Sequence, residues 1–195
     1  MEPGFTPLSQ QNRPVSELFP YAEKGTSGYK PDEVTEFLDR AKRVYEGLEE
    51  GIDSSVIRQV SFALVDSEGY NTHEVDQALW RLEEAFAARE RAGKTEEVGE
   101  SAYLKGVRAQ AQEILDRVAR PRKEKFRKAT VLRQGYRVSD VDDFCDRLVS
   151  YFQGQEPISV ATVRNQKFRT QIGGYDEIQV DRVLDETVSV ILAVR

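Results

Sequence analysis

The sequence predicts an all-α protein, made of repeated helix–turn–helix units that come in two pairs joined by a linker helix. The main observation is a motif, Gly-Tyr followed by four variable positions and Val, which occurs four times in the 195 residues. A second is the spacing of these copies, whose tyrosines are 41, 66 and 39 residues apart. No segment shows the alternation of apolar and polar residues that is typical of strands. Together these features favour a helical repeat architecture.

Each copy of the motif is followed by apolar residues at helical spacing. After the first copy they are Val34, Phe37, Leu38 and Tyr45, at positions i, i+3, i+4 and i+11. Such positions form one stripe of an α-helix, so each copy is expected to begin an amphipathic helix. The residues assigned to the four repeat joints are Gly28, Tyr29, Val34, Gly69, Tyr70, Val75, Gly135, Tyr136, Val141, Gly174, Tyr175 and Val180.

The residues between Tyr and Val predict where these helices start. Asn71 with Glu74, and Asp176 with Gln179, have the spacing of a capping box, in which cap and third helical residue bond reciprocally. The third copy has no capping residue directly after its Gly-Tyr, so its helix is expected to start at Ser139.

The motif is therefore interpreted as a joint between two helices. Its Gly is expected to end the preceding helix at positive φ, and its Tyr to pack on the Val of the next helix as a hydrophobic staple. The segments 54–68 and 159–172, which precede two of the glycines, place apolar residues at helical intervals and are expected to be those preceding helices.

The spacing of the copies also predicts the domain organisation. Residues 1–16 are expected to be a flexible tail, because they are rich in Pro, Gln and Ser. Residues 17–92 and 126–195 hold the two pairs of repeats, and residues 93–125 form a linker. Within the linker, the polar stretch KTEEVGE is expected to be a loop.

A helix is expected to follow that loop, ending near Pro121. Its apolar residues recur at intervals of three and four but cover only about two heptads, too few for an independent coiled coil. This stripe should pack on the repeats or on its copy in a second chain, and consists of Leu104, Val107, Ala111, Leu115 and Val118.

Charge is distributed unevenly along the chain. Residues 1–98 carry 11 basic and 20 acidic side chains, whereas residues 99–195 carry 17 basic and 14 acidic ones, within a total net charge of −6. Residues 117–133, called the basic segment below, hold eight basic side chains and one acidic one, Glu124. Such a run predicts either a solvated face or a contact surface for anionic lipid or nucleic acid.

Residues typical of catalysis or metal binding are scarce. The single histidine, His73, lies in the first turn of a repeat helix, and Cys145 occupies a position that is leucine in the other three copies. We therefore expect a surface histidine, a cysteine that acts as a small core residue, and no catalytic residue, cofactor or metal. The single cysteine also excludes an internal disulfide, which suits a reducing cytoplasm, and no apolar run is long enough to span a membrane.

An acidic residue follows the repeat Val in three copies. These residues are Asp76, Asp142 and Asp181, whereas the first copy has Thr35. Early in a helix, a carboxylate interacts favourably with the helix dipole, and this role is assigned to them.

The shared pattern Gly-Tyr-x-x-x-Glu-Val-Asp-x-Phe-Leu-Asp resembles the N-terminal domain of DivIVA proteins, which are bacterial scaffolds that mark curved membrane at division sites and poles. Among these, the chain is most similar to the actinobacterial DivIVA-domain repeat type, although the first copy departs at Thr35 and the third at Cys145. It also lacks the long coiled coil of DivIVA itself. Family members carry a phenylalanine upstream of Gly-Tyr; Phe168 matches it, and Phe62, Phe126 and Phe19 are looser matches at varied distances.

The resemblance also implies a membrane-contacting tip. The family places an exposed apolar residue and an arginine just before Gly-Tyr, and only the third copy, with Val131-Leu132-Arg133-Gln134, keeps this character. The alternative is that Val131 and Leu132 simply end a core helix. With the basic segment, the candidate membrane or anion contacts are Arg120, Arg122, Lys123, Lys125, Arg127, Lys128, Leu132 and Arg133.

The resemblance implies a non-enzymatic, cytoplasmic scaffold or adaptor in cell division or polar growth. Its expected partners are division or cell-envelope proteins, an anionic membrane at the inner face, and a second copy of the chain. A nucleic-acid-binding helical protein that uses the basic segment is the alternative, although the acid-rich repeat helices would repel phosphates. A third hypothesis, a ligand or enzyme site in a cleft between repeat pairs, is supported by no group of residues.

Overall fold

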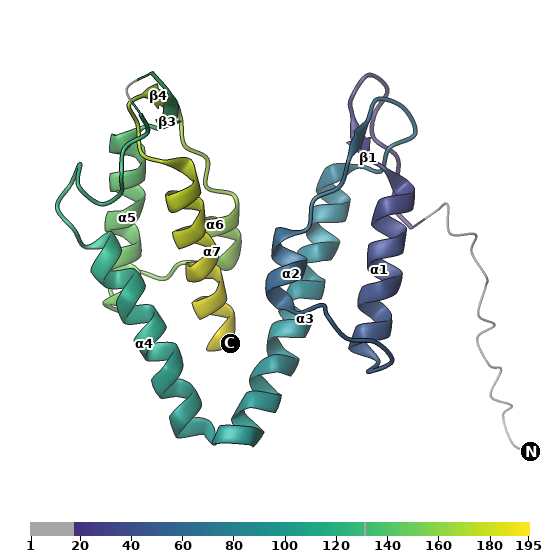
Figure 1. Cartoon of the computed structure of the whole chain (residues 1–195), viewed down its shortest axis with the longest axis horizontal. Coiled ribbons are helices and arrows are strands. Elements are labelled where there is room, and N and C mark those ends of the chain that lie inside the picture. Colours follow the sequence, from purple (N-terminus) through teal and green to yellow (C-terminus); the bar gives the residue numbers. More distant parts are fainter. Residues whose placement is uncertain (1–17, 131) are drawn as a thin grey trace, which may run out of the picture. The chain divides into compact units, whose positions relative to one another are not determined.

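A computed structural model describes residues 18–130 and 132–195, and the predicted tail of residues 1–16 lies outside this range. The described chain is mostly helical, which confirms the all-α prediction (Figure 1). Its helices are α1 (Pro31–Tyr45), α2 (Ser54–Gln59), α3 (Thr72–Val98), α4 (Glu100–Val118), α5 (Val138–Phe152), α6 (Val160–Arg164) and α7 (Glu177–Ala193). Four short strands accompany them: β1 (Gly28–Tyr29), β2 (Leu64–Val65), β3 (Gln134–Tyr136) and β4 (Thr170–Ile172).

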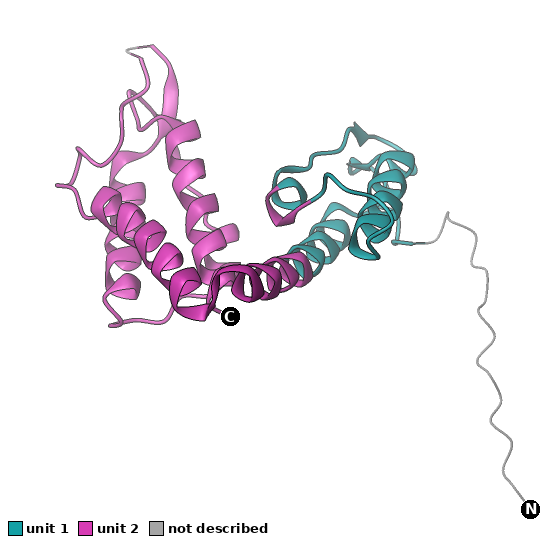
Figure 2. Ribbon diagram, turned by 60° about the horizontal axis from the view of Figure 1, so that its bottom comes forward, with its two compact units in different colours: residues 1–52, 56–83 teal, residues 53–55, 84–195 magenta. Residues whose placement is uncertain are grey.

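The chain divides into two compact units (Figure 2). Unit 1 comprises residues 1–52 and 56–83, and unit 2 comprises residues 53–55 and 84–195. Unit 1 contains the first two copies of the motif and unit 2 the last two. As the periodicity predicts, a long helix follows every copy: α1, α3, α5 and α7.

The strands correct the prediction that the segments before two of the glycines are helical throughout. Only Ser54–Gln59 and Val160–Arg164 form helices there, after which the chain extends into β2 and β4. Strand β1 pairs antiparallel with β2, and β3 pairs antiparallel with β4. With two or three residues each, the strands are too short to show a period-2 pattern.

The predicted loop KTEEVGE is also wrong, because α3 continues as a helix to Val98. Lys and Glu are good helix formers, so the polar composition of this stretch marks an exposed helix rather than a loop. The break falls at Gly99, whose φ of 83° lies in the left-handed region that glycine adopts without strain.

Helix α4, predicted as the linker, belongs to the core of unit 2. It packs against α5 and α7, and buries Val107, Ile114 and Val118. These side chains join the cluster formed by α5, α6 and α7, in which Leu148 and Val180 are also buried. Of the two placements predicted for the apolar stripe, packing on the repeats is therefore observed.

The predicted cap of α3 is confirmed, although its capping box is not closed. The Asn71 side-chain oxygen accepts hydrogen bonds from the backbone N–H groups of His73 and Glu74, at 3.0 and 3.3 Å. The Asn71 N–H donates to the Pro20 carbonyl at 2.8 Å instead of to Glu74.

The hydrogen bonds at the start of α7 follow the same pattern. Asp176 accepts from the Gln179 N–H at 3.2 Å, whereas the Asp176 N–H donates to the Arg127 carbonyl at 2.8 Å. The Gln179 side-chain oxygen accepts from the Arg127 N–H at 3.1 Å. In both units, therefore, an upstream segment takes the hydrogen bonds that the sequence assigns to a local box. Helix α5 begins at Val138, one residue before the predicted Ser139, and has no side-chain cap.

A buried ion pair joins two helices of unit 1. The Arg58 guanidinium on α2 lies 2.7 Å from the Glu83 carboxylate on α3, and the Glu83 side chain is only 1% exposed. A buried charge that loses its partner is strongly destabilising, because neither water nor another group compensates for it.

Replacing Glu83 with Ala should therefore lower the free energy of unfolding by about 3 kcal/mol, measured by urea denaturation of the full chain. The neighbouring Glu84→Ala is the control, since Glu84 is exposed and lies 3.8 Å from Arg195. An equal effect of the two substitutions would contradict this assignment.

Candidate functional site: the Gly-Tyr crossings and the basic segment

The two Gly-Tyr segments of each unit cross and bond to each other. In unit 1, the Tyr29 N–H donates to the Tyr70 carbonyl at 2.9 Å, and the Tyr70 N–H donates to the Tyr29 carbonyl at 2.8 Å. In unit 2, Tyr136 and Tyr175 exchange the same two bonds at 2.9 and 2.8 Å. We call each arrangement a Gly-Tyr crossing.

The crossing explains the motif glycines and corrects their predicted role. None of the four has positive φ, so none is the left-handed residue that ends a helix. A Cβ on Gly28 would lie 2.5 Å from the carbonyl carbon of Gly69, and one on Gly135 would collide with the Tyr175 carbonyl oxygen. Gly is required because two backbones approach closely here.

The tyrosine hydroxyls bond to the helix of the other copy. Tyr29 donates to Asp76 on α3 at 3.1 Å, and Tyr175 donates to Asp142 on α5 at 2.9 Å. The acidic residue after the repeat Val is thus a hydrogen-bond acceptor for the paired copy, a role that the helix dipole did not suggest.

A third such pair joins Tyr136 and Asp181 in unit 2. Burial, together with the nearby Asp181 carboxylate, raises the pKa of Tyr136 to about 12. Burial likewise raises the pKa of Asp181. The Tyr136 phenol therefore remains protonated at neutral pH and can donate to Asp181.

A phenylalanine packs against each tyrosine ring, and it also comes from the other copy. Each is contributed by the segment that precedes the Gly-Tyr of the paired copy. The pairs, with their ring-centroid distances, are Phe62–Tyr29 at 5.5 Å, Phe19–Tyr70 at 5.5 Å, Phe168–Tyr136 at 5.2 Å and Phe126–Tyr175 at 5.4 Å. All four upstream phenylalanines therefore hold equivalent places, despite their varied spacing.

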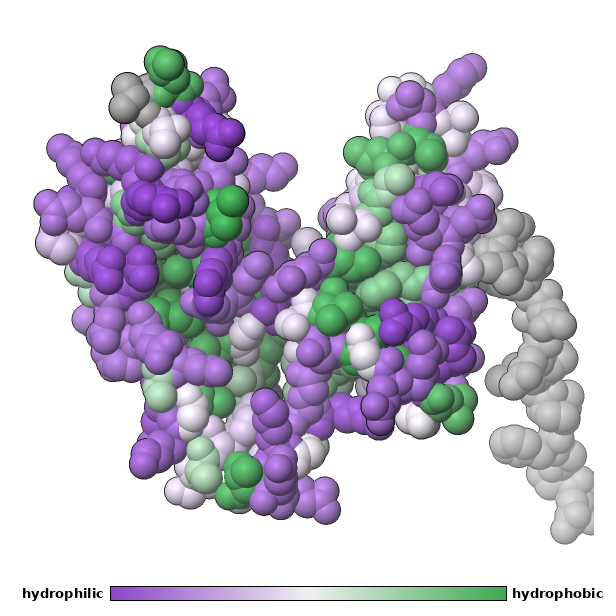
Figure 3. All heavy atoms as spheres, in the orientation of Figure 1, coloured by the Kyte–Doolittle hydropathy of each residue, from purple (hydrophilic) through white to green (hydrophobic). Residues whose placement is uncertain are grey.

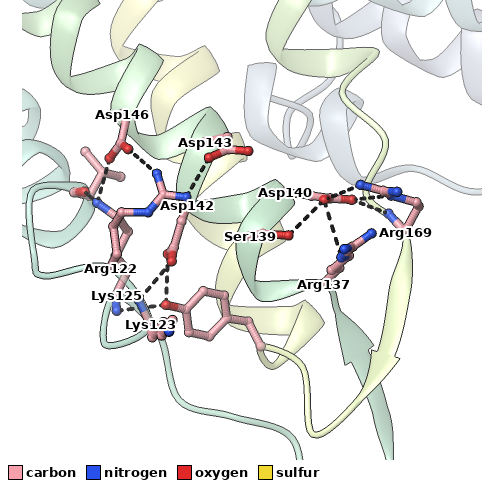
Figure 4. Close-up of polar contacts among 12 residues, drawn as sticks. Arg122, Lys123, Lys125, Arg137, Ser139, Asp140, Asp142, Asp143, Asp146 and Arg169 are labelled. Carbon is pink, nitrogen blue, oxygen red and sulfur yellow. Dashed lines mark hydrogen bonds and ion pairs between the residues drawn. The ribbon is translucent and has the colours of Figure 1, made fainter.

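Part of the basic segment forms a polar network on α5 in unit 2. The buried Asp142 carboxylate accepts from the Lys123 N–H at 2.8 Å as well as from Tyr175 (Figure 4). The Lys125 N–H donates to the Tyr175 hydroxyl at 3.2 Å. Lys123 adopts a φ of 70°, unusual for a residue with a side chain, where its N–H meets this carboxylate.

Two of the predicted anion contacts are neutralised within this network. Arg122 binds Asp143 and Asp146, each at 2.6 Å, and these carboxylates raise its pKa (Figure 4). Lys125 is 2% exposed, and its ammonium donates to the Val118 carbonyl and to Asp146. The sequence did not reveal this because the acidic face of α5 approaches the segment only in the folded chain.

The other predicted contacts are exposed. Arg127 forms an ion pair with Asp176 at 3.1 Å while its side chain remains 71% exposed. The remaining members of the predicted set lie on the surface: Arg120, Lys123, Lys128, Leu132 and Arg133.

Apolar side chains also lie at the end of unit 2 that carries β3 and β4 (Figure 3). Leu132 is 92% exposed, which excludes the alternative that it ends a core helix, and Val131 lies outside the described residues. Ile172, 69% exposed, pairs with Gln134 across the β3–β4 ladder. We call Leu132, Arg133 and Ile172 the unit 2 tip. The sequence analysis did not assign Ile172 to the membrane contact, because Gly173 and not an arginine follows it before the fourth Gly-Tyr.

The two residues considered for chemistry occupy the predicted kinds of place. Cys145 is buried, and burial raises the pKa of its thiol to about 12, so it is a protonated core residue. His73 is exposed and its ring nitrogen lies 2.7 Å from the Gln77 side-chain nitrogen.

Comparison of the chain with family models, with curated proteins and with solved structures gives no match. Among the described residues, no helix is both long enough and apolar enough to cross a membrane. In the same part of the chain, no group of three or more His, Cys, Asp or Glu side chains is arranged to hold a metal ion.

The close approach of two backbones at a Gly-Tyr crossing predicts that adding one methyl group at a motif glycine strongly destabilises the fold. Gly135→Ala should lower the free energy of unfolding by about 3 kcal/mol, because its Cβ cannot avoid the Tyr175 carbonyl. Gly106→Ala, inside α4 with no atom near its Cβ, should raise it by about 0.5–1 kcal/mol. Urea denaturation of both variants measures the difference, and similar values for the two would argue against a crossing.

A second ion pair predicts a dependence of stability on acid. Arg169 contacts Asp140 through its Nε and Nη2 at 2.8 and 2.7 Å, and so lowers the pKa of this carboxyl from 3.8 to about 2 (Figure 4). The ionised form is favoured by folding, so this stabilisation is present above pH 4 and is lost as pH falls toward 2. Asp140→Asn should reduce the slope of stability against pH in this window, and an unchanged slope would exclude the pair as its cause.

Proposed function

We propose that this protein is a non-enzymatic scaffold or adaptor of the DivIVA-domain type. It would act in bacterial cell division or polar growth, by contacting division or cell-envelope proteins and the inner face of an anionic membrane. Its location would be cytoplasmic and peripheral to the membrane, and it would associate with further copies of itself.

The observation that carries the proposal is the composition of the unit 2 tip. Leu132 and Ile172 are large, apolar and exposed, and Arg133 lies beside Leu132. An isolated exposed apolar residue needs no explanation, but two at one tip with an adjacent cation fit an interfacial contact. Gln134, two residues after Leu132, pairs with Ile172 in the β3–β4 ladder. This pairing brings the two apolar residues to the same end of unit 2.

The energy available at this tip supports weak, reversible membrane binding. Burying the side chains of Leu132 and Ile172 contributes about 1.5–3 kcal/mol each if burial is complete. Each basic residue near an anionic leaflet contributes about 1 kcal/mol. Arg133 and Lys128 are the basic residues that would contribute this electrostatic attraction. With two apolar and two basic side chains, a single tip supplies only modest affinity for a membrane. Several copies acting together would raise it without any new contact.

The nucleic-acid alternative is less well supported. Two of the cations that it would use, Arg122 and Lys125, already bind carboxylates of the same unit. Asp143 and Asp146 lie beside them and would repel a phosphate backbone. Among the remaining exposed cations, Arg133 is the chain neighbour of the exposed Leu132, and a membrane interface accommodates this combination better than a phosphate chain does.

Unit 1 differs at the corresponding place. Thr26, Ser27, Ser67 and Glu68 precede its two Gly-Tyr segments, and the Ser27 hydroxyl donates to Asp66 at 2.8 Å. This polar end is suited to contacts with protein or water rather than with acyl chains. Membrane contact is therefore assigned to unit 2 alone.

Co-sedimentation with vesicles of phosphatidylglycerol and phosphatidylcholine tests the proposal. The wild-type chain should bind at low salt and dissociate as salt increases, because exposed charges are screened. Leu132→Glu with Ile172→Glu should reduce binding by 10-fold or more. The matched control is Leu48→Glu with Leu64→Glu, since these residues are also exposed, at 74% and 61%, but lie in unit 1.

Three results would contradict the assignment. The wild type could fail to bind at low salt, the control could lose binding equally, or the tip variant could retain it. A salt-sensitive shift of DNA without vesicle binding would favour the nucleic-acid alternative.

A further inference from the structure

Unit 2 exposes a further large apolar side chain that is not part of the unit 2 tip. Ile178 lies in the first turn of α7 and is 80% exposed. The residues at the same position of the other three motif copies are Asp32, His73 and Ser139, all of them polar. Polar and acidic residues suit the first turn of a helix, because they bond to its free N–H groups or interact favourably with its dipole. The start of α7 therefore does not explain an isoleucine at this position.

Ile178 lines the same surface hollow as residues of the tip. The hollow has a volume of about 430 Å³, and Arg133 and Gln134, which follow Leu132 in the chain, line it together with Ile178. We call it the α7 hollow. Gln134 also pairs with Ile172 in the β3–β4 ladder. Leu132, Ile172 and Ile178 are thus connected through two shared neighbours, and Ile178 is not an isolated exposed residue of the ordinary kind.

The α7 hollow also carries positive charge. Arg127, Lys128 and Arg133 line it. The Arg127 guanidinium bonds to the Asp176 carboxylate at 3.1 Å. The side chains of Lys128 and Arg133 form no hydrogen bond or ion pair with another described residue. Two cations are therefore available to an anionic partner at the place where the apolar side chains are exposed.

One acidic side chain of the hollow opposes such a partner. Glu177 lines the hollow and forms no ion pair with another described residue, whereas Asp176 caps α7 and binds Arg127. Glu177 is explained by its place in the first turn of α7, where a carboxylate interacts favourably with the helix dipole. Near an anionic surface this same charge is repelled, so removing it should have an effect opposite in sign to the removal of Ile178.

We propose that the lipid contact of unit 2 extends from the tip across the α7 hollow to Ile178. The Ile178 side chain inserts into an anionic leaflet, while Lys128 and Arg133 face its phosphate groups. This inference deepens the proposed function and rests on it, since it assigns a further contact residue to the same membrane interaction. A lipid surface fits because it accepts apolar side chains and attracts cations at one depth, the boundary between headgroups and acyl chains.

A fluorescent label at residue 178 tests insertion directly in the full-length chain. Cys145, the one cysteine of the sequence, is 3% exposed, so Ile178→Cys provides an accessible thiol for a nitrobenzoxadiazole label. With vesicles of phosphatidylglycerol and phosphatidylcholine at low salt, the label emission should become stronger and shift to shorter wavelength. The change should reverse at high salt. Leu48→Cys, labelled in the same way, is the control, because Leu48 is similarly exposed but lies in unit 1.

Two substitutions with opposite expected effects test the same surface by co-sedimentation. Ile178→Asp, which introduces the residue of the first copy, should lower vesicle affinity by about 5- to 10-fold while leaving stability in urea unchanged or higher. Glu177→Gln should raise affinity at low salt by about 3- to 5-fold. The controls are Leu48→Asp and Glu74→Gln, which change an exposed leucine and an exposed first-turn acid of unit 1 and should bind as wild type.

Several outcomes would overturn the inference. The label at residue 178 could stay unchanged while the chain sediments with vesicles, the label at residue 48 could respond equally, or Ile178→Asp could keep wild-type affinity. A label response that depends on protein concentration without vesicles would assign the surface to a second copy of the chain instead.

Failure of this inference and failure of the proposed function give different results. If wild type binds vesicles and the Leu132→Glu, Ile172→Glu chain does not, but Ile178→Asp binds normally, only the extension to Ile178 is wrong. If wild type does not bind vesicles at low salt, both are wrong.

Discussion

The reciprocal hydrogen bonds between two Gly-Tyr segments are the constraint on which each unit depends. They bring two backbones so close that a Cβ at Gly28 or Gly135 would collide with the opposite chain. Each tyrosine then packs on a phenylalanine of the other copy, and in three cases its hydroxyl bonds to an acid on the other helix. The direction of every repeat helix is thus set by its partner copy. A single copy would lack the acceptor, the aromatic neighbour and the backbone partner that position it.

The same arrangement explains why the charge of the basic segment does not remain a uniform surface. In unit 2 the segment folds back onto α5, where Asp142, Asp143 and Asp146 take the Lys123 N–H and the side chains of Arg122 and Lys125. Basic residues that look like a binding patch in the linear sequence therefore bind carboxylates of α5 and stabilise the fold of unit 2. Of the exposed remainder, Arg133 adjoins Leu132, so a basic and an apolar side chain are exposed together there.

The two units share one design but differ at the positions that contact solvent. Unit 2 has an apolar tip and a filled acidic face on α5, whereas unit 1 has a polar end. Asp142, whose carboxylate holds the backbone of the basic segment in unit 2, corresponds in sequence to Thr35 of unit 1. Under the proposed function, unit 2 contacts lipid.

By itself, the sequence determined the helical class, the helix after each motif and the caps at Asn71 and Asp176, because these depend on residues within one or two turns. It also placed Cys145 in the core through the leucines of the other copies. It did not predict the short strands, the close backbone approach that requires the motif glycines, or the ion pairs of Arg122 and Lys125 with α5. These depend on residues such as Tyr29 and Asp76, or Lys125 and Tyr175, that lie 47 and 50 positions apart. Only the tertiary structure decided them, because close approach and charge compensation are properties of chains already brought together.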